Sequence, residues 1–174
     1  AYAPALNEGK ITLATTIDDE EYEYKNGQSV NNWDKKYIGP TRVRYGIEHS
    51  MNVLAVKTLT DYVGETESYD YLLNFGFTTL AHGTEADRDA NGTVWTDANL
   101  PLALGGLTHG VTNVELCAAY AAIANSGNYI EPIYYTKILD HNGNVLIEKN
   151  SAGRSVIKES TAWLLTSAME DVVT

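Results

Sequence analysis

Residues 102–127 read LALGGLTHGVTNVELCAAYAAIANSG and contain the clearest local signal in the chain. Thr112 is followed three residues later by Glu115, so each side chain can bond an unpaired amide at a helix start, as in a capping box. The alanine-rich segment that follows is predicted to be a helix that continues to about Ser126. Gly127 is expected to end it, because glycine tolerates the left-handed conformation past a helix terminus.

Similar patterns predict further elements on both sides of this segment. On the amino-terminal side we expect a short apolar segment that ends at Gly9, followed by an extended loop over residues 15–39. A first helix is expected from Pro40-Thr41, and a second from an N-cap at Ser50 to Gly64. A third helix is expected over residues 65–75, with Gly76 at its end. On the other side, His141-Asn142-Gly143-Asn144 predicts a hairpin turn, because Asn-Gly favours such turns. A last helix is expected near Glu159. The sequence therefore predicts an α+β fold, mostly helical, with one β-hairpin near residues 133–149.

Length, charge and cysteine content exclude several classes of protein. The 174 residues suffice for one ordinary domain with a real core. The formal net charge of −11 would repel nucleic-acid phosphates and an anionic membrane surface, so nucleic-acid binding is disfavoured. No stretch approaches the roughly 20 apolar residues of a membrane span. The single cysteine, Cys117, excludes an internal disulfide and a cysteine-based zinc site, and its apolar surroundings predict an inert core thiol.

Ser50-Met51-Asn52 is the first candidate for chemistry. Two small polar side chains would lie at the mouth of a predicted helix, where free amides and the positive end of the helix dipole favour an anionic or carbonyl ligand. On spacing alone, a simple cap at Ser50 with Asn52 in the first helical turn is the commoner arrangement. His49 precedes Ser50, but neighbouring residues on a helix point away from each other, so His49 is not expected to act as its base.

Asp87-Arg88-Asp89-Ala90-Asn91-Gly92 matches the opening of a calcium loop. Ala98 stands at the twelfth position, where a bidentate Glu is expected, and no flanking helices are predicted. An ordinary turn rich in Asp and Asn is the better interpretation.

The remaining polar clusters favour structural roles. His82, His109 and His141 are scattered, and with His49 they show no metal-ligand spacing. Asp18-Asp19-Glu20-Glu21 is expected to be a solvated run rather than the paired carboxylates of a glycoside hydrolase. The sequence therefore predicts neither a metal site nor a cofactor.

Several short blocks follow one another in a recognisable order. They are Tyr2-Ala3-Pro4-Ala5-Leu6, Gly9-Lys10-Ile11-Thr12, Ile17-Asp18-Asp19-Glu20, Asn32-Trp33, Gly39-Pro40-Thr41, Arg44, Ser50-Met51-Asn52, residues 102–108, Gly110-Val111-Thr112, Glu115, Ala118-Ala119-Tyr120, Ala124-Asn125, Gly127 and Glu131-Pro132. In order and approximate spacing these blocks resemble the transpeptidase domain of penicillin-binding proteins, most closely the class A, bifunctional members. S-x-N alone is weak evidence, but the blocks together are specific and cover nearly the whole chain. The resemblance implies the mostly helical lobe of a serine β-lactamase/transpeptidase-like domain.

The resemblance also implies a reaction. In the family, the serine of a Ser-x-x-Lys motif attacks the D-Ala–D-Ala carbonyl of a peptidoglycan stem peptide, and an amine of a neighbouring stem resolves the acyl-enzyme into a cross-link. β-Lactams mimic the donor and trap the acyl-enzyme. The resemblance gives Ser50 a place in the proton path to the leaving amine, and gives Asn52 the tasks of holding a motif lysine and bonding the substrate's backbone amide.

The same resemblance implies partners and a location. The ligands would be stem peptides and β-lactams, and the protein partner would be the remainder of the transpeptidase domain. The parent would act at the extracytoplasmic face of the cell membrane, tethered by a segment absent here.

The resemblance places Ser-x-x-Lys just before Tyr2-Ala3-Pro4-Ala5-Leu6 and Lys-Thr-Gly after Asp171-Val172-Val173-Thr174, so both ends look cut. We therefore expect residues 1–174 to be a partial transpeptidase domain that lacks both motifs and is inactive alone. Two alternatives remain open. One is a β-lactamase or D,D-carboxypeptidase on the same fold, although no Glu-x-x-Leu-Asn segment of the class A β-lactamase kind is present. The other is a non-catalytic β-lactam sensor or interaction module.

Overall fold

Residues 1–24 and 27–173 are described by a computed structural model. The helices in chain order are α1 (Tyr2–Asn7), α2 (Val43–Glu48), α3 (Asn52–Lys57), α4 (Glu65–Asn74), α5 (Asn113–Ala124) and α6 (Glu159–Glu170). The strands are β1 (Thr16–Asp19), β2 (Tyr22–Glu23), β3 (Ser29–Val30), β4 (Gly39–Arg42), β5 (Asn128–Ile130), β6 (Lys137–Leu139), β7 (Val145–Glu148) and β8 (Gly153–Ser155). A π-helical turn spans Thr58–Val63, and 3-10 turns span Glu85–Asp87 and Leu100–Leu104.

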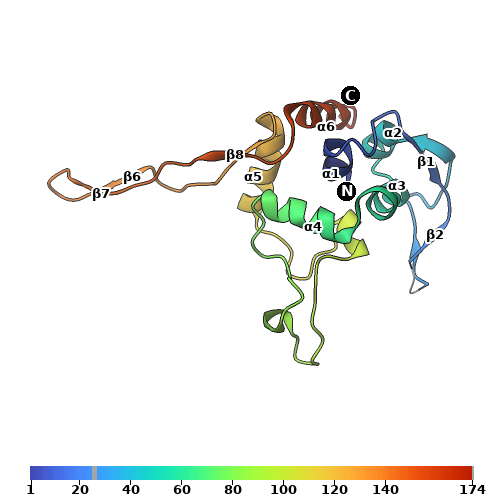
Figure 1. Cartoon of the computed structure of the whole chain (residues 1–174), viewed down its shortest axis with the longest axis horizontal. Helices are drawn as coiled ribbons and strands as arrows, with labels where there is room; N and C mark the ends of the chain where they lie inside the picture. Colours follow the sequence, from blue (N-terminus) through green and yellow to red (C-terminus); the bar gives the residue numbers. More distant parts are fainter. Residues whose placement is uncertain (25–26, 174) are drawn as a thin grey trace.

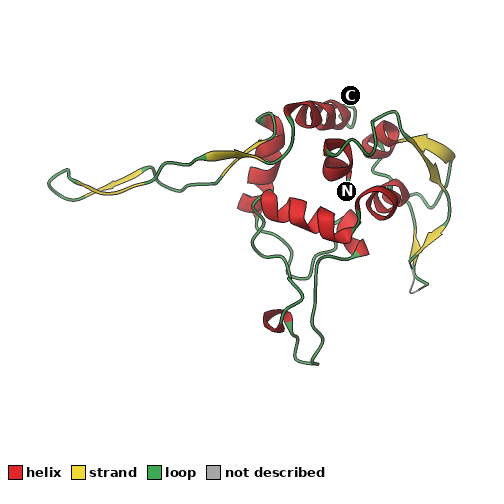
Figure 2. Ribbon diagram, in the orientation of Figure 1, coloured by secondary structure: helices red, strands yellow, loops and turns green. Residues whose placement is uncertain are grey.

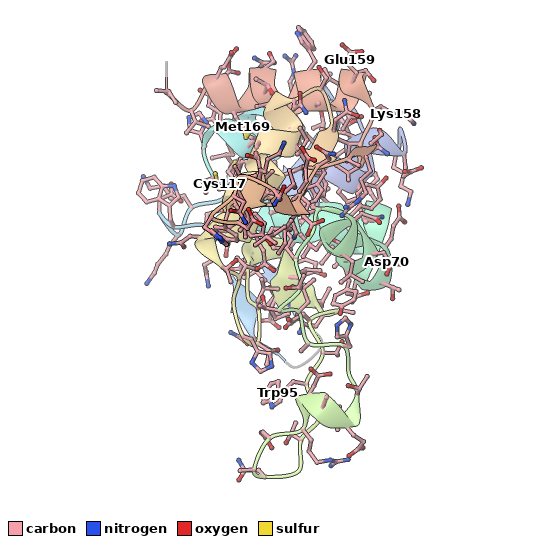
Figure 3. The ribbon with its side chains drawn as sticks, turned by 90° about the vertical axis from the view of Figure 1, so that its left-hand side faces the viewer. Asp70, Trp95, Cys117, Lys158, Glu159 and Met169 are labelled. Atoms are coloured by element: carbon pink, nitrogen blue, oxygen red, sulfur yellow. The ribbon has the colours of Figure 1, made fainter. Side chains whose placement is uncertain are left out.

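The helices form one body, from which two arms project (Figures 1 and 2). One arm is the long ribbon that carries β5 to β8, and the other is the loop between α4 and the turn Leu100–Leu104. Figure 3 shows Trp95 on this loop arm, well below Cys117 and Met169 on the helical body. Among the residues described, no helix combines the length and apolar character that crossing a bilayer requires.

The core of the body takes one small or branched side chain from each of five helices. These are Ala5, Val43, Leu54, Ala122 and Ala162, each no more than 1% exposed. Alanine at three of these positions lets helix backbones approach closely, and tight packing of this kind stabilises the fold by removing apolar surface from water.

An ion pair fastens the start of α2 to the end of α6. Arg44 donates from Nε to Asp171 Oδ2 at 2.5 Å and from a terminal guanidinium nitrogen to Asp171 Oδ1 at 2.8 Å. The same guanidinium also bonds the backbone carbonyl of Ser167 at 3.1 Å. A two-point contact of this geometry fixes orientation as well as distance. Thr174, the last residue of the block that contains Asp171, lies outside the described residues.

The predicted capping box is confirmed. Thr112 Oγ1 accepts from the Glu115 amide at 3.2 Å, and Glu115 Oε2 accepts from the Thr112 amide at 3.0 Å. Glu115 Oε1 accepts from both the amide and the hydroxyl of Thr78, at 2.8 and 2.6 Å. One carboxylate therefore starts α5 and also ties the preceding loop to it.

These bonds give Glu115 a predictable pH dependence. The Thr78 hydroxyl, followed by the amides of Thr112 and Thr78, lowers the Glu115 pKa from 4.5 to about 2. A depressed folded-state pKa stabilises the fold above the unfolded value, and that contribution disappears as the pH falls from about 4.5 toward 2. We expect Glu115→Gln to lower Tm by about 2–4 °C at pH 7, the effect of losing about 1 kcal/mol of capping.

Circular dichroism melts at several pH values test this expectation. The Tm difference between wild type and Glu115→Gln should shrink below about pH 4.5, whereas the exposed Glu131→Gln control should differ little from wild type at any pH. A difference for Glu115→Gln that stays constant down to pH 2 would show that its carboxylate charge contributes nothing.

The prediction of a single hairpin is wrong, because the described residues form four two-stranded antiparallel sheets. The hairpin of β6 and β7 is the predicted one and is confirmed, with Gly143 at φ +84 in its turn. The other pairs are β1 with β4, β2 with β3, and β5 with β8. Three of these strands lie within residues 15–39, which were expected to form a loop, and of that range residues 25–26 lie outside the described residues.

The helices lie in the predicted segments, but some of their ends differ: α3 begins at Asn52 rather than after a cap at Ser50, and α5 ends at Ala124 rather than near Ser126. α4 and α6 occupy the predicted segments, and Gly64 and Gly76 have positive φ at the expected ends. The helix expected from Pro40-Thr41 begins instead at Val43, because Pro40 and Thr41 pair with Asp18 and Ile17 in the sheet of β1 and β4.

Two expectations about burial are wrong. Cys117 is exposed, because α5 packs through Ala118, Ala119 and Ala122 on its opposite side. Asp19, expected to be solvated, is 1% exposed and accepts from the Asn32 amide group at 2.8 Å. Burial of this carboxylate is tolerated because Asn32 and a second donor, the Ile38 amide at 2.9 Å, satisfy its oxygens.

Candidate functional site

Ser50-Met51-Asn52 lies at the sharp turn between α2 and α3. Ser50 has φ +52, in the left-handed region, and its side chain is exposed. Met51 is the N-cap residue and is buried, and α3 starts at Asn52. The prediction that Ser50 caps the helix is therefore wrong. A non-glycine residue at positive φ is uncommon, and such strain concentrates at functional sites.

Gly46 allows α2 and α3 to meet closely beside this turn. A Cβ added to Gly46 would lie 2.5 Å from Leu54 Cδ2. Since real Cβ atoms do not approach so closely, a side chain at Gly46 would force the buried Leu54 side chain to shift.

The Asn52 side chain is held by the neighbouring loop. Its Nδ2 donates to the Asn31 carbonyl at 2.8 Å. The adjacent Asn32 is buried, and its Oδ1 accepts from the Val53 amide at 3.3 Å, which supplies the start of α3 with a cap from outside the helix. Asn32 is itself anchored on Asp19. The buried chain Asp19–Asn32–Val53 therefore fixes the segment that orients Asn52.

Sequence reasoning missed these supporting residues. Asn32 entered only as part of a matching block, and Asp19 only as a solvated acid. Their roles depend on contacts 13 and 21 residues apart along the chain, which no local pattern reports.

A cavity of about 310 Å³ opens at the Ser50 turn. Its lining comes from α1, the α2–α3 turn and the Leu100–Leu104 turn: Tyr2, Gly46, Ile47, Ser50, Met51, Asn52, Ala55, Ala103 and Leu104. Three of the matching sequence blocks, distant from one another along the chain, thus meet at one cavity. The Tyr2 hydroxyl is buried and has no hydrogen-bond partner among the described residues, and burial raises its pKa.

A bare Ser-x-x-Lys string does occur, at Ser155-Val156-Ile157-Lys158, so the expectation that the chain lacks this pattern is wrong. Ser155 ends β8, and its Oγ donates to the Ile157 carbonyl at 3.3 Å. Lys158 is the N-cap residue of α6, and its Nζ donates to the Asn7 carbonyl at 2.5 Å. Neither residue lines the Ser50 cavity. Ser155 and Lys158 therefore make structural contacts with other residues, and they do not form a pair of serine and lysine base.

The calcium-like segment forms the predicted Asp-rich turn. Asp89 Oδ1 accepts from the amides of Asn91 and Thr93, both at 2.9 Å, and Oδ2 accepts from Trp95 Nε1 at 3.0 Å. Both oxygens are thus engaged within the loop. Across residues 1–24 and 27–173, no three His, Cys, Asp or Glu side chains gather in a way that could hold a metal ion.

The histidines next to candidate residues have partners of their own. The His49 ring stacks on Tyr45 with 3.8 Å between ring centroids, and its Nδ1 lies 3.2 Å from the Tyr45 carbonyl oxygen. His82 Nδ1 lies 2.6 Å from the Tyr69 hydroxyl. Neither His49 nor His82 lines the Ser50 cavity, and each is bonded to a tyrosine instead.

Residues 1–174 match the family model described as penicillin binding protein transpeptidase domain. Penicillin-binding protein 1A of Streptococcus pneumoniae (strain ATCC BAA-255 / R6) is 33% identical over 175 residues, covering 99% of this chain and 22% of the relative. Penicillin-binding protein 1A/1B of Bacillus subtilis (strain 168) is 28% identical over 175 residues, covering 99% of this chain and 17% of the relative. The chain thus spans about a fifth of the length of these curated relatives.

Solved structures show the same fold. The penicillin-binding protein 1A structure from Haemophilus influenzae matches with a TM-score of 0.73 and 26% identity, over 96% of this chain and 27% of that one. The D,D-transpeptidase domain from Eggerthella lenta matches with a TM-score of 0.74 and 18% identity, over 99% of this chain and 46% of that one, and at this identity it supports the fold alone. The predicted α+β fold and the family resemblance are confirmed.

Proposed function

Because the chain belongs to the penicillin binding protein transpeptidase domain family, we propose that residues 1–174 supply the Ser50–Asn52 corner of a peptidoglycan D,D-transpeptidase site. In this proposal the chain is part of a larger domain that cross-links stem peptides through a serine acyl-enzyme and is acylated by β-lactams. The observation that carries the proposal is the meeting of Tyr2, Ser50, Asn52 and Leu104 at one cavity.

The Asn52 amide is oriented for an acceptor role. Its nitrogen must face the Asn31 carbonyl, 2.8 Å away, because two oxygens would repel each other there. The amide oxygen is therefore the atom that remains to accept a bond from a lysine ammonium or a substrate N–H. This orientation supports the proposed tasks of Asn52, which are to hold a motif lysine and to bind the backbone amide of the donor peptide.

Ser50 suits proton transfer rather than attack. Its exposed hydroxyl lies at the cavity and has no hydrogen bond to a lysine or histidine among the described residues. A serine without a positioned base is a weak nucleophile. We therefore assign it a place in the proton path to the leaving amine, with the nucleophile supplied by a Ser-x-x-Lys motif elsewhere in the protein.

The proposed partners follow from this reaction. They are stem peptides, β-lactams and the remainder of the transpeptidase domain. The proposed site of action is the extracytoplasmic face of the cell membrane, where peptidoglycan is assembled.

A polypeptide of residues 1–174 alone is expected not to form a covalent adduct with a fluorescent penicillin. The reason is that, among residues 1–24 and 27–173, neither Ser50 nor Ser155 has a lysine or histidine bonded to its hydroxyl. Gel fluorescence after incubation measures the labelling, and a longer protein that carries this chain together with Ser-x-x-Lys and Lys-Thr-Gly motifs should label fully.

Ser50→Ala and Ser155→Ala variants of residues 1–174 complete this test. Labelling of the short polypeptide at the level of the longer protein, abolished by either substitution, would show that the chain has a nucleophile of its own. A longer protein that carries both motifs and fails to label would contradict the proposed function.

A further inference from the structure

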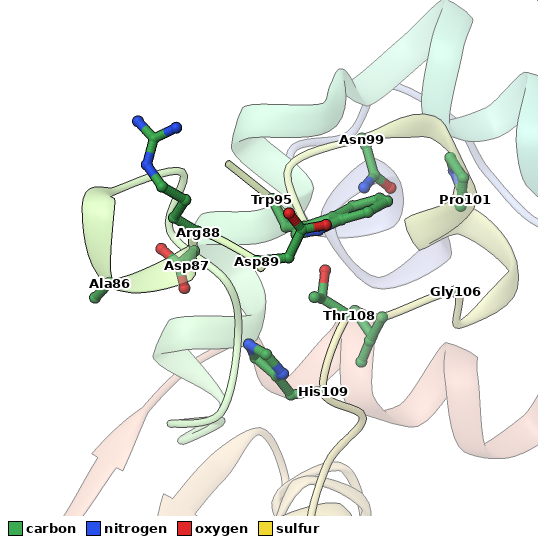
Figure 4. Close-up of a pocket in the computed structure, with 11 residues that line it drawn as sticks. Ala86, Asp87, Arg88, Asp89, Trp95, Asn99, Pro101, Gly106, Thr108 and His109 are labelled. Atoms are coloured by element: carbon green, nitrogen blue, oxygen red, sulfur yellow. The ribbon is translucent and has the colours of Figure 1, made fainter. Parts of the chain in front are cut away.

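A second cavity, of about 560 Å³, lies between the loop arm and the Leu100–Leu104 turn (Figure 4). Its lining is Ala86, Asp87, Arg88, Asp89, Trp95, Asn99, Pro101, Gly106, Leu107, Thr108 and His109. The volume lies in the range of sites that hold small organic ligands. The proposed transpeptidase role uses none of these side chains.

Trp95 provides a fixed aromatic face in this cavity. The side chain is 46% exposed and lines the cavity. Its Nε1 donates to Asp89 Oδ2 at 3.0 Å, so the position of the indole is set by the loop itself. A rigid, partly exposed indole offers a large apolar contact at little entropic cost. Pro101 and Leu107 extend the apolar wall.

The charges in the lining are engaged within the loop. Arg88 donates from Nε and a terminal nitrogen to the Glu85 carboxylate, at 2.8 and 2.7 Å, and its other terminal nitrogen donates to the Gly92 carbonyl. Both Asp89 oxygens accept from loop donors. With Asp87, the lining carries two acids and one arginine, so it has no surplus positive charge to hold a phosphate or a carboxylate.

A neutral ligand with one apolar face and polar edges fits this lining best. A saccharide ring has that character, because its C–H face can lie on an indole while its hydroxyl and amide groups bond polar neighbours. Within the described part of the chain, the exposed His109 ring shows only a charge interaction with Asp97, so it can donate or accept such a bond.

The Trp95 cavity and the Ser50 cavity each share lining residues with a third cavity. Leu104 lines both the Ser50 cavity and a third cavity of about 270 Å³. Pro101 and Gly106 line this third cavity and also the Trp95 cavity. The segment from Pro101 to Gly106 therefore contributes to all three cavities, which places the Trp95 cavity near the Ser50 corner.

We propose that the Trp95 cavity is a saccharide subsite, which binds the neutral N-acetylated sugar of the same polymer whose stem peptide reaches Ser50. This inference rests on the proposed function for the identity of the polymer. The binding of a free sugar oligomer does not depend on transpeptidation, so the two proposals can fail separately.

The test is an NMR titration of the full 174-residue chain with chitotetraose, a neutral oligomer of N-acetylglucosamine. The chain has three tryptophans, so three indole N–H signals report on Trp33, Trp95 and Trp163. We expect only the Trp95 signal to shift, and a sugar-free stem pentapeptide to leave that signal in place.

Two variants and a control locate the subsite. Trp95→Ala and His109→Ala should each weaken chitotetraose binding by about tenfold, measured by calorimetry with folding checked by circular dichroism. His109→Ala keeps every hydrogen bond of the loop arm, so it tests the subsite even if Trp95→Ala loosens the loop. Trp163→Ala removes an indole that is 69% exposed on α6 and should leave binding unchanged.

An unshifted Trp95 signal at about 10 mM chitotetraose, or equal binding by wild type and both cavity variants, would overturn the subsite. Penicillin labelling of the longer protein would still stand in that case. Sugar binding in a longer protein that fails to label would instead retain the subsite and remove the transpeptidase proposal.

Discussion

A Gly127→Ala variant is expected to melt roughly 10 °C below the wild-type chain, the shift that follows from a loss of about 3–4 kcal/mol in a chain of this size. Gly127 has φ +82, and a Cβ there would lie 2.1 Å from the Ile157 carbonyl oxygen. The obstacle is backbone, so no side-chain rotation relieves it. Gly127 also accepts from the Val156 amide at 2.8 Å, so a displacement would separate the end of α5 from the segment that leads into α6.

Gly143→Ala is the matched control. Gly143 has a similar φ of +84, but nothing lies within 4 Å of an added Cβ at the hairpin turn. It should therefore show only the cost of a left-handed alanine, about 1 kcal/mol. Thermal melts followed by circular dichroism separate the two effects. Equal losses in the two variants would show that the Ile157 contact is relieved at no cost.

Local signals in the sequence located most of the helices, although the starts of α2 and α3 were predicted wrongly. The Thr112–Glu115 capping box starts α5 as the spacing predicts, and Gly127, with φ +82, lies shortly after the helix ends at Ala124. Gly64 and Gly76 mark helix ends in the same way. These devices act within a few residues, so a single sequence contains all the information that they need.

The strand pairs and the buried acid could not be predicted, because they depend on partners far along the chain. β1 is four residues long and pairs with β4, which begins 20 residues after the end of β1 at Asp19. Strands this short carry little alternation of apolar and polar residues. The burial of Asp19 depends in the same way on Asn32 and Ile38, which satisfy its oxygens.

The candidate site was predicted only in part. The resemblance identified Ser50 and Asn52, and the structure brings both to one cavity. The cap assigned to Ser50 failed because its backbone is left-handed, a conformation that sequence patterns assign to glycine or asparagine. The support from Asn32 and the contribution of Tyr2 to the cavity appear only after the chain is folded.

The geometry around Asn52 separates a structural role from a chemical one. Asn52 is only partly buried and makes one hydrogen bond, to the Asn31 carbonyl, so its loss should cost about 1 kcal/mol or less of stability. Asn32 is buried and bonds Asp19, the Lys36 carbonyl and the Val53 amide. Asn32 therefore has the structural role, and Asn52 is the asparagine that is available for a chemical role.

In a longer protein that labels with penicillin, Asn52→Ala is expected to lower the second-order acylation rate constant by about 10²–10³-fold, as for other side-chain amides that act on the reacting centre. Asn32→Ala should instead lower Tm strongly, since it leaves a buried carboxylate with one donor fewer and α3 without its outside cap. Stopped-flow acylation by a chromogenic β-lactam, together with thermal melts of both variants, measures the contrast. If Asn52→Ala acylated at the wild-type rate, its amide would do no more than brace the start of α3, because the Asn31 contact would then account for every effect of the side chain.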